Sequence, residues 1–143
     1  MLARIRKAQE SEAGFTLIEL LVVIIIIGIL AAIAILVFLN QRKKGVDAGL
    51  KSDLRQAANE MESGFTDTQT YPASITIQKT TGNTFTGGIN AAGTAHCIED
   101  YNVKGTRNSA TSQYVHVSDQ GGLQASTIVV CPAGYSTTAV TFP

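Results

Sequence analysis

One carboxylate near the start of a long apolar segment is the residue in this sequence whose position most needs a chemical explanation. Glu19 is followed by an almost unbroken apolar run over residues 20–39, and Gly14 stands shortly before it. An ionisable side chain in a membrane-spanning helix costs at least about 2.5 to 3.5 kcal/mol near the bilayer centre and indicates a function by default. Glu19 lies near one end of the run, where the cost is lower, so the question is which group it pairs with.

The apolar run is long enough to cross a bilayer. An α-helix rises about 1.5 Å per residue, so the roughly 25 residues of 15–39 match a hydrocarbon core of about 30 Å. The β-branched block at 22–27 would be poor in a soluble helix, but unsatisfied backbone groups cost far more in lipid, so a helix is predicted. A secretory signal peptide carries its cleavage site after the apolar region. Here Gly14 precedes that region, so a cut at Gly14 would leave the helix on the mature chain, whereas an uncleaved signal anchor fits the hydropathy alone equally well.

The residues 14–20, GFTLIEL, resemble the prepilin processing motif of type IV pilins and the related pseudopilins. In that motif a short charged leader ends in glycine, phenylalanine follows, and glutamate stands at the fifth mature position. The resemblance implies that a membrane-embedded aspartate peptidase cuts between Gly14 and Phe15 and that the same enzyme N-methylates the new Phe15 amine. It also implies that mature subunits reside in the membrane before they polymerise into a helical filament.

The resemblance gives Glu19 a partner. After such a cut Phe15 carries a cationic amine at a helix N-terminus, where the macrodipole already supplies about half a positive charge. A carboxylate at about 4 Å gains roughly 4 kcal/mol at an effective dielectric near 20, before the cost of desolvation is counted. The amine could belong to the same chain or to a neighbour. The neighbour is favoured, as in the related family, because pairing with an entering subunit would also fix its register; Glu19 turned toward the lipid headgroups without a role is the alternative.

Length and charge limit what else the chain can be. With 143 residues it has room for one small domain besides a spanning helix. The formal net charge is zero, which gives no basic stripe for nucleic acid, so no direct nucleic-acid binding is expected. Cations on both sides of the apolar run leave the membrane orientation nearly balanced, and the processing motif has to place the N-terminus in the cytoplasm. These cations are Arg4, Arg6 and Lys7 before the run and Arg42, Lys43 and Lys44 after it.

Apolar residues recur at steps of three and four after residue 40, which predicts an amphipathic continuation of the helix. Asp47 and Lys51 are expected to form an i,i+4 pair on its surface, and Gly64 is expected to end it. The apolar stripe consists of Val46, Leu50, Leu54, Ala57 or Ala58, Met61 and Phe65.

The remaining sequence is rich in Thr, Gly, Asn and Ser, which is typical of turns and short strands. Gly87-Gly88 and Gly121-Gly122 predict turns, and the second is expected to join 114–117 to 127–130 in a hairpin. Strands covered by the helical stripe give an α+β fold, and pilin heads likewise pack an antiparallel sheet on the outer half of a long helix. The candidate strands are 75–79, 95–103, 113–118, 126–131 and 138–142.

Cys97 and Cys131 are the only cysteines. If the head is exported, an even pair in an oxidising compartment predicts a disulfide, which would contribute about 3 to 4 kcal/mol in the chain-entropy model. Two buried free thiols in a cytosolic domain are the alternative, and a zinc site would want more ligands than these cysteines, His96 and His116 offer at their spacings. Many pilin heads carry a C-terminal cysteine pair, so the resemblance also implies a Cys97–Cys131 disulfide.

No catalytic set accompanies these features, and neither an enzyme nor a metal site or cofactor is predicted. His96 and His116 are expected to be surface or hydrogen-bonded strand histidines, and the acidic residues of the head are expected to be solvated loop charges, with a calcium site as the weaker alternative. These acidic residues are Asp67, Glu99, Asp100 and Asp119.

The sequence therefore predicts a structural subunit of a type IV pilus, for adhesion, twitching motility or DNA uptake. The alternative is a pseudopilin of a secretion or competence system, and a distant one is a membrane-anchored enzyme or binding domain. The expected partners are further copies of the chain, the peptidase and N-methyltransferase, the assembly platform, minor pilins, and the inner membrane before export to the cell surface. The expected organisation is a leader at 1–14, a membrane and filament-core helix at 15–39, its amphipathic continuation at 40–64, and a β-rich head with a disulfide at 65–143.

Overall fold

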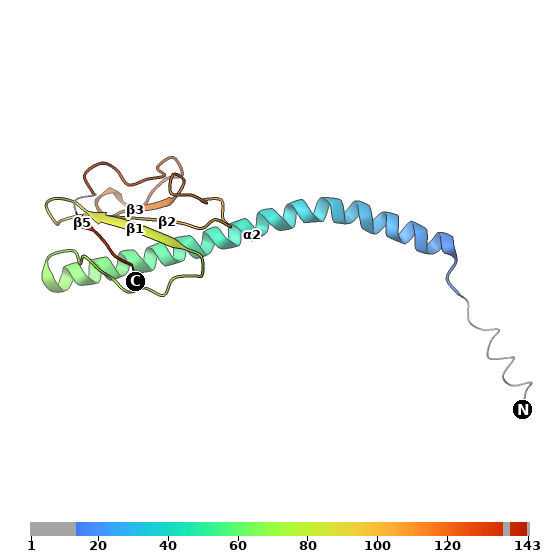
Figure 1. Ribbon diagram of the computed structural model, residues 1–143, viewed down its shortest axis with the longest axis horizontal. Coiled ribbons are helices and arrows are strands. Elements are labelled where there is room, and N and C mark those ends of the chain that lie inside the picture. Colours follow the sequence, from blue (N-terminus) through green and yellow to red (C-terminus); the bar gives the residue numbers. More distant parts are fainter. Residues whose placement is uncertain (1–13, 136–137, 143) are drawn as a thin grey trace, which may run out of the picture. The chain divides into compact units, whose positions relative to one another are not determined.

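A computed structural model of the chain describes residues 14–135 and 138–142. It has an α+β fold, with one long helix followed by a small antiparallel sheet (Figure 1). The predicted leader, including its charged residues Arg4, Arg6 and Lys7, lies outside the described residues except for Gly14. The elements are α2 (Leu17–Thr68), β1 (Thr84–Ile89), β2 (His96–Tyr101), β3 (Tyr114–Val117), the 3₁₀ turn η1 (Ser118–Gln120), β4 (Gly122–Leu123) and β5 (Thr138–Ala139).

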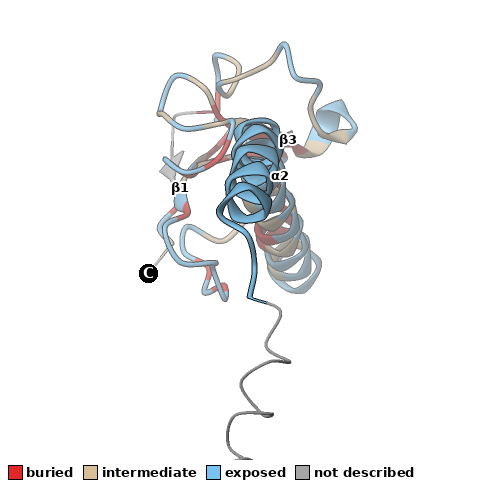
Figure 2. Cartoon of the chain, turned by 90° about the vertical axis from the view of Figure 1, so that its right-hand side faces the viewer, coloured by how far each residue is buried: buried red, intermediate tan, exposed pale blue. Residues whose placement is uncertain are grey.

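The first compact unit, in its described part, consists of residues 14–39 and is helical from Leu17 onward. Every residue of this stretch is exposed, as its pale blue colour in Figure 2 shows, and Phe15 is 88% exposed. The helix is long and apolar enough to cross a membrane. Because apolar surface of this extent is rarely left in contact with water, it requires lipid or other protein chains to cover it.

The second compact unit begins at residue 40 and contains the rest of the chain. The amphipathic stripe predicted for its helical part is confirmed at its centre, where Leu50, Leu54, Ala57, Ala58 and Met61 are all buried. Its two ends, Val46 and Phe65, are half-buried. Burying a leucine or methionine side chain contributes about 1.5 to 3 kcal/mol, so this stripe is a main source of stability for the head. The core around it includes Ile75, Ile77, Ile89, Ile98 and Val140.

The predicted end of the helix at Gly64 is wrong, because α2 continues to Thr68. The hydroxyl of Thr68 donates a hydrogen bond of 2.9 Å to the carbonyl of Gly64 and so supports the last turn. Gly64 serves a different purpose: a Cβ atom there would lie 2.8 Å from Cγ of Pro72. The glycine therefore lets the returning chain cross the helix closely. The helix ends at Thr68, and the next residue, Gln69, has a φ of 57°.

The five strands form one antiparallel sheet in the order β4-β3-β2-β1-β5. The strands predicted at 95–103, 113–118 and 138–142 contain β2, β3 and β5. Side chains on the two faces of a strand alternate, so His96, Ile98 and Asp100 of β2 share one face and Cys97 and Glu99 lie on the other. Ile98 belongs to the core formed with α2, whereas Cys97 packs in a second cluster with Ala95, Val115, Val117 and Tyr135.

Several turn and strand predictions are wrong. Gly87 and Gly88 lie inside β1, where a Cβ atom on Gly87 would approach the Cys97 carbonyl oxygen at 3.1 Å and the Phe142 ring at 3.3 Å. The turn at Gly121 leads into β4 and not into 127–130, because the main chain of Gln124 donates to the Val115 carbonyl at 2.8 Å. Residues 75–79 and 126–131 form no strand, and the first segment is bridged to the sheet only through Ser74 and Thr141.

The predicted surface pair of Asp47 and Lys51 is also wrong. The Asp47 carboxylate is buried and accepts hydrogen bonds from the main-chain N–H of Thr106 at 2.8 Å and from the Thr106 hydroxyl. Lys51 Nζ instead lies 4.8 Å from the centroid of the Tyr114 ring. Asp47 therefore fastens the helix to the head, since a buried carboxylate is stable only when donors satisfy it.

Candidate functional site

Glu19 is held at the N-terminus of α2 by the residue three positions earlier. Its Oε2 atom accepts hydrogen bonds from the main-chain N–H of Thr16 at 2.9 Å and from the Thr16 hydroxyl at 2.7 Å. In return the main-chain N–H of Glu19 donates to the Thr16 hydroxyl oxygen at 3.3 Å. This reciprocal arrangement is a capping box, which satisfies N–H groups that the first turn of a helix leaves without partners.

Thr16 is the functional residue that the sequence analysis missed, although the T-x-x-E spacing at 16–19 was a signal for it. The helix begins at Leu17, two residues after the predicted start, because Thr16 occupies the capping position. The capping box also gives the carboxylate a partner within its own chain before any cut. Phe15 directly precedes Thr16, so a new amine at Phe15 would form one residue away from a main-chain N–H that Glu19 already binds.

Gly14 and Phe15 lie outside regular secondary structure and are exposed. An extended, accessible segment is what a peptidase needs at its cleavage site, because helical backbone has to unwind before it can be cut. The geometry of 14–16 is therefore compatible with processing at this point.

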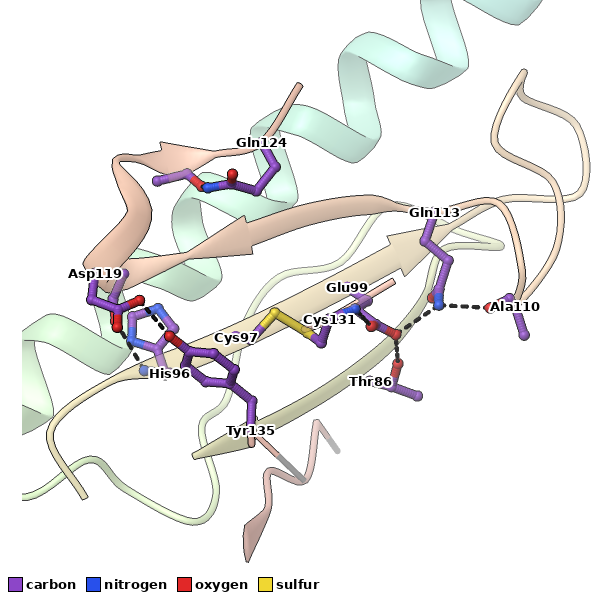
Figure 3. The surroundings of a disulfide bond; sticks show 12 residues. Thr86, His96, Cys97, Glu99, Ala110, Gln113, Asp119, Gln124, Cys131 and Tyr135 are labelled. Carbon is purple, nitrogen blue, oxygen red and sulfur yellow. Dashed lines mark hydrogen bonds between the residues drawn. A yellow bond between two sulfur atoms is a disulfide. The ribbon is translucent and has the colours of Figure 1, made fainter. Parts of the chain in front are cut away.

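Cys97 and Cys131 form a disulfide with a Cα–Cα distance of 6.0 Å, as predicted (Figure 3). This pairing excludes the alternatives of free thiols and of a zinc site built on the two cysteines. Cys97 belongs to β2 and is fully buried, whereas Cys131 lies in the loop after β4. The disulfide therefore fastens this loop to the sheet face opposite α2.

Glu99 is not a solvated loop charge as predicted but the centre of a hydrogen-bond cluster under the same loop (Figure 3). Its carboxylate accepts from Thr86 Oγ1 at 3.2 Å, from Gln113 Nε2 at 2.6 Å and from the main-chain N–H of Cys131. Tyr135 is held in a similar way, since its hydroxyl donates to Asp119. Burial, followed by this carboxylate, raises the pKa of Tyr135 to about 12.

A shallow open hollow of about 290 Å³ lies beside Cys131 and is bordered by Thr86, Glu99, Pro132 and Tyr135. Both oxygens of Glu99 already accept hydrogen bonds from the chain itself, so this carboxylate is not free to bind a ligand. The hollow therefore gives little support to the alternative of a ligand-binding head, which needs convergent unpaired polar groups.

His96 is not a surface or hydrogen-bonded histidine as predicted, whereas His116 is half-buried and only its Nδ1 atom is buried without a partner among the described residues. His96 is fully buried, and neither of its ring nitrogens has a hydrogen-bond partner among the described residues. Burial, and then the neighbouring His116, lowers the pKa of His96 to about 4, so its ring is neutral at pH 7. His96 Nδ1 lies 3.6 Å from the Glu62 carboxylate, but because the ring is neutral the two side chains do not form an ion pair at that pH.

Asp100 is the second buried group without a partner. Neither carboxylate oxygen has a hydrogen-bond partner in the described part of the chain, and the side chain is fully buried. Burial, and then the nearby Asp53 carboxylate, raises the pKa of Asp100 to about 8. Within residues 14–135 and 138–142, no group of three or more His, Cys, Asp or Glu side chains is placed to hold a metal ion.

Comparison with known proteins identifies the family. Residues 11–35 match the family model of the prokaryotic N-terminal methylation motif. The type IV wide pilus major component PilA4 of Thermus thermophilus is 32% identical over 96 residues, which cover 63% of this chain and 73% of that protein. The chain belongs to the type IV pilins. It is therefore a structural protein and not an enzyme.

A second relative of this pilin is the type IV major pilin protein PilA of Myxococcus xanthus, which is 37% identical over 68 residues. The match covers 48% of this chain but 31% of the Myxococcus protein, so the two share less than half of their lengths. The region of this pilin that matches the family model includes Gly14, Phe15, Thr16 and Glu19, whose geometry is described above.

Proposed function

We propose that this pilin is cut between Gly14 and Phe15, methylated at the Phe15 amine, and polymerised as a subunit of a type IV pilus. The observation that carries the proposal is the fully exposed apolar helix of residues 17–39 with a carboxylate held at its start. Lipid would cover this surface before assembly, and the same segment of other subunits would cover it in the filament. The leader and the N-terminus would face the cytoplasm, and the head would face the outside.

Glu19 would change partners during assembly. In the uncut chain its carboxylate is bound by Thr16 of the same helix, which lowers the cost of holding a charge at the edge of the membrane. After the cut, a subunit entering the filament would bring a cationic Phe15 amine to the Glu19 of a subunit already in place. Each contact would repeat without closing, and a repeated heterologous contact of this kind produces a helical polymer.

The organisation that follows is a removed leader at 1–14, a filament-core segment at 15–39, and a head-bearing part from residue 40. The helical portion of that last part ends at Thr68 and not at the expected residue 64. Both relatives are major pilus components by name, which favours a filament subunit over a pseudopilin. The peptidase and N-methyltransferase, the assembly platform, minor pilins and the inner membrane are the partners that this route requires, and the filament would serve adhesion, twitching motility or DNA uptake.

Substituting Glu19→Ala tests the proposal. The variant is expected to be cut and inserted normally but to give no filaments, because an entering subunit would lose its electrostatic partner. Asp67→Ala, which removes an exposed carboxylate elsewhere on α2, is the matched control and should leave filaments intact. Mass spectrometry of sheared surface material should show a chain that begins at methylated Phe15, and electron microscopy should show the filaments. Filaments at normal yield from Glu19→Ala, or a surface chain that still begins at Met1, would contradict the proposal.

A further inference from the structure

Three cations follow one another shortly after the apolar run. Arg42, Lys43 and Lys44 are exposed, and none of them forms a salt bridge within the described part of the chain. They lie in a helical stretch, residues 40–45, in which every residue is exposed, and the first half-buried residue of the head is Val46. We call residues 40–45 the basic segment. No described part of the head covers it, so its charges are available to another molecule.

The basic segment has no anion of its own. Opposite charges support a helix when they stand three or four positions apart. Within four residues of the three cations the only acidic side chain is that of Asp47. Its carboxylate is buried and accepts hydrogen bonds from the main-chain N–H and the hydroxyl of Thr106. The three charges are therefore balanced neither along the helix nor by a contact with the described head.

The three cations lie in one thin layer around the helix. Each residue advances by about 100° and rises by about 1.5 Å, so residues 42–44 spread over about 200° of the circumference within about 3 Å of length. A protein surface or a nucleic-acid duplex contacts a helix from one side and reaches only part of this layer. A layer of anions that surrounds the helix reaches all three charges. The headgroups of anionic phospholipids form such a layer where a helix leaves a bilayer.

The position of the basic segment along the chain fits the headgroup layer. The apolar run ends at Leu39, and Arg42 follows three residues later. A bilayer is about 40 to 45 Å thick with its polar regions and about 30 Å without them, so each headgroup layer is about 5 to 8 Å deep. The basic segment extends over about 9 Å of helix. If residues 15–39 span the hydrocarbon core, these cations therefore lie at the depth of the lipid phosphates.

We propose that the basic segment binds the headgroups of anionic phospholipids, such as phosphatidylglycerol, in the leaflet through which the helix leaves the membrane. The inference rests on the proposed function, because it requires the apolar segment to reside in a bilayer before assembly. The leader cations Arg4, Arg6 and Lys7 would be lost at the cut. The basic segment would then be the cation cluster that flanks the apolar run of the processed subunit, and it would hold the subunit at a fixed depth until assembly.

The lipid selectivity of the full-length chain in phosphatidylcholine vesicles tests this proposal. Spin-labelled phosphatidylglycerol and spin-labelled phosphatidylcholine are added in separate samples, and electron paramagnetic resonance gives the ratio of their association constants at the protein surface. At low salt the wild type should prefer phosphatidylglycerol at least about fivefold, which is the gain expected from one cation beside an anionic headgroup. The preference should decrease at high salt, because dissolved ions screen these charges.

Two triple variants of equal charge locate the selectivity. The first replaces each cation of the basic segment by glutamine (Arg42→Gln, Lys43→Gln, Lys44→Gln) and should bind the two lipids equally. The second removes three exposed cations of the head and should keep the preference of the wild type. These control changes are Arg55→Gln, Lys79→Gln and Lys104→Gln. A short DNA duplex, added to the chain in vesicles of phosphatidylcholine alone, tests for the alternative of a nucleic-acid site and should not bind.

The proposal is overturned by any of four results: no preference in the wild type, an unchanged preference in the first triple variant, an equal loss in the control, or binding of the duplex that the first triple variant lacks. Flotation of the vesicles separates this inference from the proposed function. If the wild type floats with the vesicles but shows no preference, the lipid site fails and the proposed function stands. If the wild type does not float, the apolar segment does not enter a bilayer and the proposed function fails first. If Glu19→Ala assembles filaments normally while the wild type prefers phosphatidylglycerol, the assembly through Glu19 fails and the lipid site stands.

Discussion

The imidazole rings of His96 and His116 are stacked in parallel, with their centroids 5.5 Å apart and an angle of 5° between their planes. The Tyr71 and His96 rings pack in a T-shaped arrangement with centroids 4.8 Å apart, and Glu62 of α2 lies 3.6 Å from His96 Nδ1. Two neighbouring strands thus bring two titratable bases together beneath the end of the helix. Burial lowers the pKa of both, since a charged imidazole would be poorly solvated here.

The stacked pair predicts that the head loses stability in acid. His96 has a pKa of about 4 in the folded head and about 6.5 when unfolded, so the unfolded chain binds the proton more readily. The contribution of a neutral His96 is present above pH 6.5 and is lost as the pH falls toward 4. The groups that face this ring are Glu62, Tyr71, His116 and Asp119.

The measurement is urea unfolding of the full chain in neutral detergent micelles at pH 4 to 8. All 4 tyrosines lie in the head, so near-ultraviolet circular dichroism reports its unfolding. His96→Gln should flatten the acid side of the stability curve relative to the wild type. An equally steep acid loss in His96→Gln would assign the effect to other groups.

Asp100 predicts a dependence of opposite sign. The folded head retains the Asp100 proton up to a pH of about 8, whereas the unfolded chain releases it above 3.8, so the free energy of unfolding falls as the pH rises between these values. Asp100→Asn keeps the size of the side chain and removes the ionisation. The variant should be more stable than the wild type at pH 8, and the difference should shrink toward pH 4.

Asp53→Asn makes the same chemical change at a carboxylate that has donors, and it is expected to act in the opposite direction. The Asp53 carboxylate accepts hydrogen bonds from the main-chain N–H of Thr80 at 2.6 Å and from Asn83 Nδ2 at 2.8 Å. The same chemical change should therefore destabilise the head at Asp53, by about 1 to 3 kcal/mol, since an amide satisfies these donors less well than a carboxylate. If both variants lose stability at pH 8, Asp100 is ionised and paired in the folded head.

Removing the disulfide should be the largest single loss in the head. Cys97 and Cys131 are 34 residues apart, and opening a loop of this size costs about 3 to 4 kcal/mol in the chain-entropy model. The double variant Cys97→Ala, Cys131→Ala should therefore unfold at a lower urea concentration, and a reductant should lower the midpoint of the wild type but not of the variant. Equal midpoints for the two chains would show that the hydrogen bonds around Glu99 hold the loop without the covalent link.

The long helix and the processing segment could be predicted because their signals are local. A run of apolar residues, the stripe from Leu50 to Met61 and the spacing from Gly14 to Glu19 depend only on neighbouring positions in the chain. The disulfide could be predicted because the sequence contains only these two cysteines.

The errors concern residues whose role depends on distant contacts. Gly87 has the composition of a turn, and only the approach of Phe142 and the Cys97 carbonyl explains a glycine within a strand. His96 and Asp100 are polar, and local sequence does not reveal that α2 covers the strand face on which they lie. Thr16 is different, because its capping signal, the T-x-x-E spacing at 16–19, depends only on neighbouring positions in the sequence.

Two glycines of α2 provide a final test of the close crossing between the helix and the returning chain. At Gly64 an added Cβ would lie 2.8 Å from Pro72 Cγ and 2.9 Å from its Cδ, whereas at Gly45 no atom lies within 4 Å. Gly45→Ala should stabilise the helix by about 1 kcal/mol, because alanine has the higher helix propensity. Gly64→Ala gains the same propensity but forces the proline ring away, so it should cost about 1 to 3 kcal/mol in the urea experiment. Stabilisation of similar size in both variants would show that the loop at Pro72 moves aside freely and that Gly64 is not required for packing.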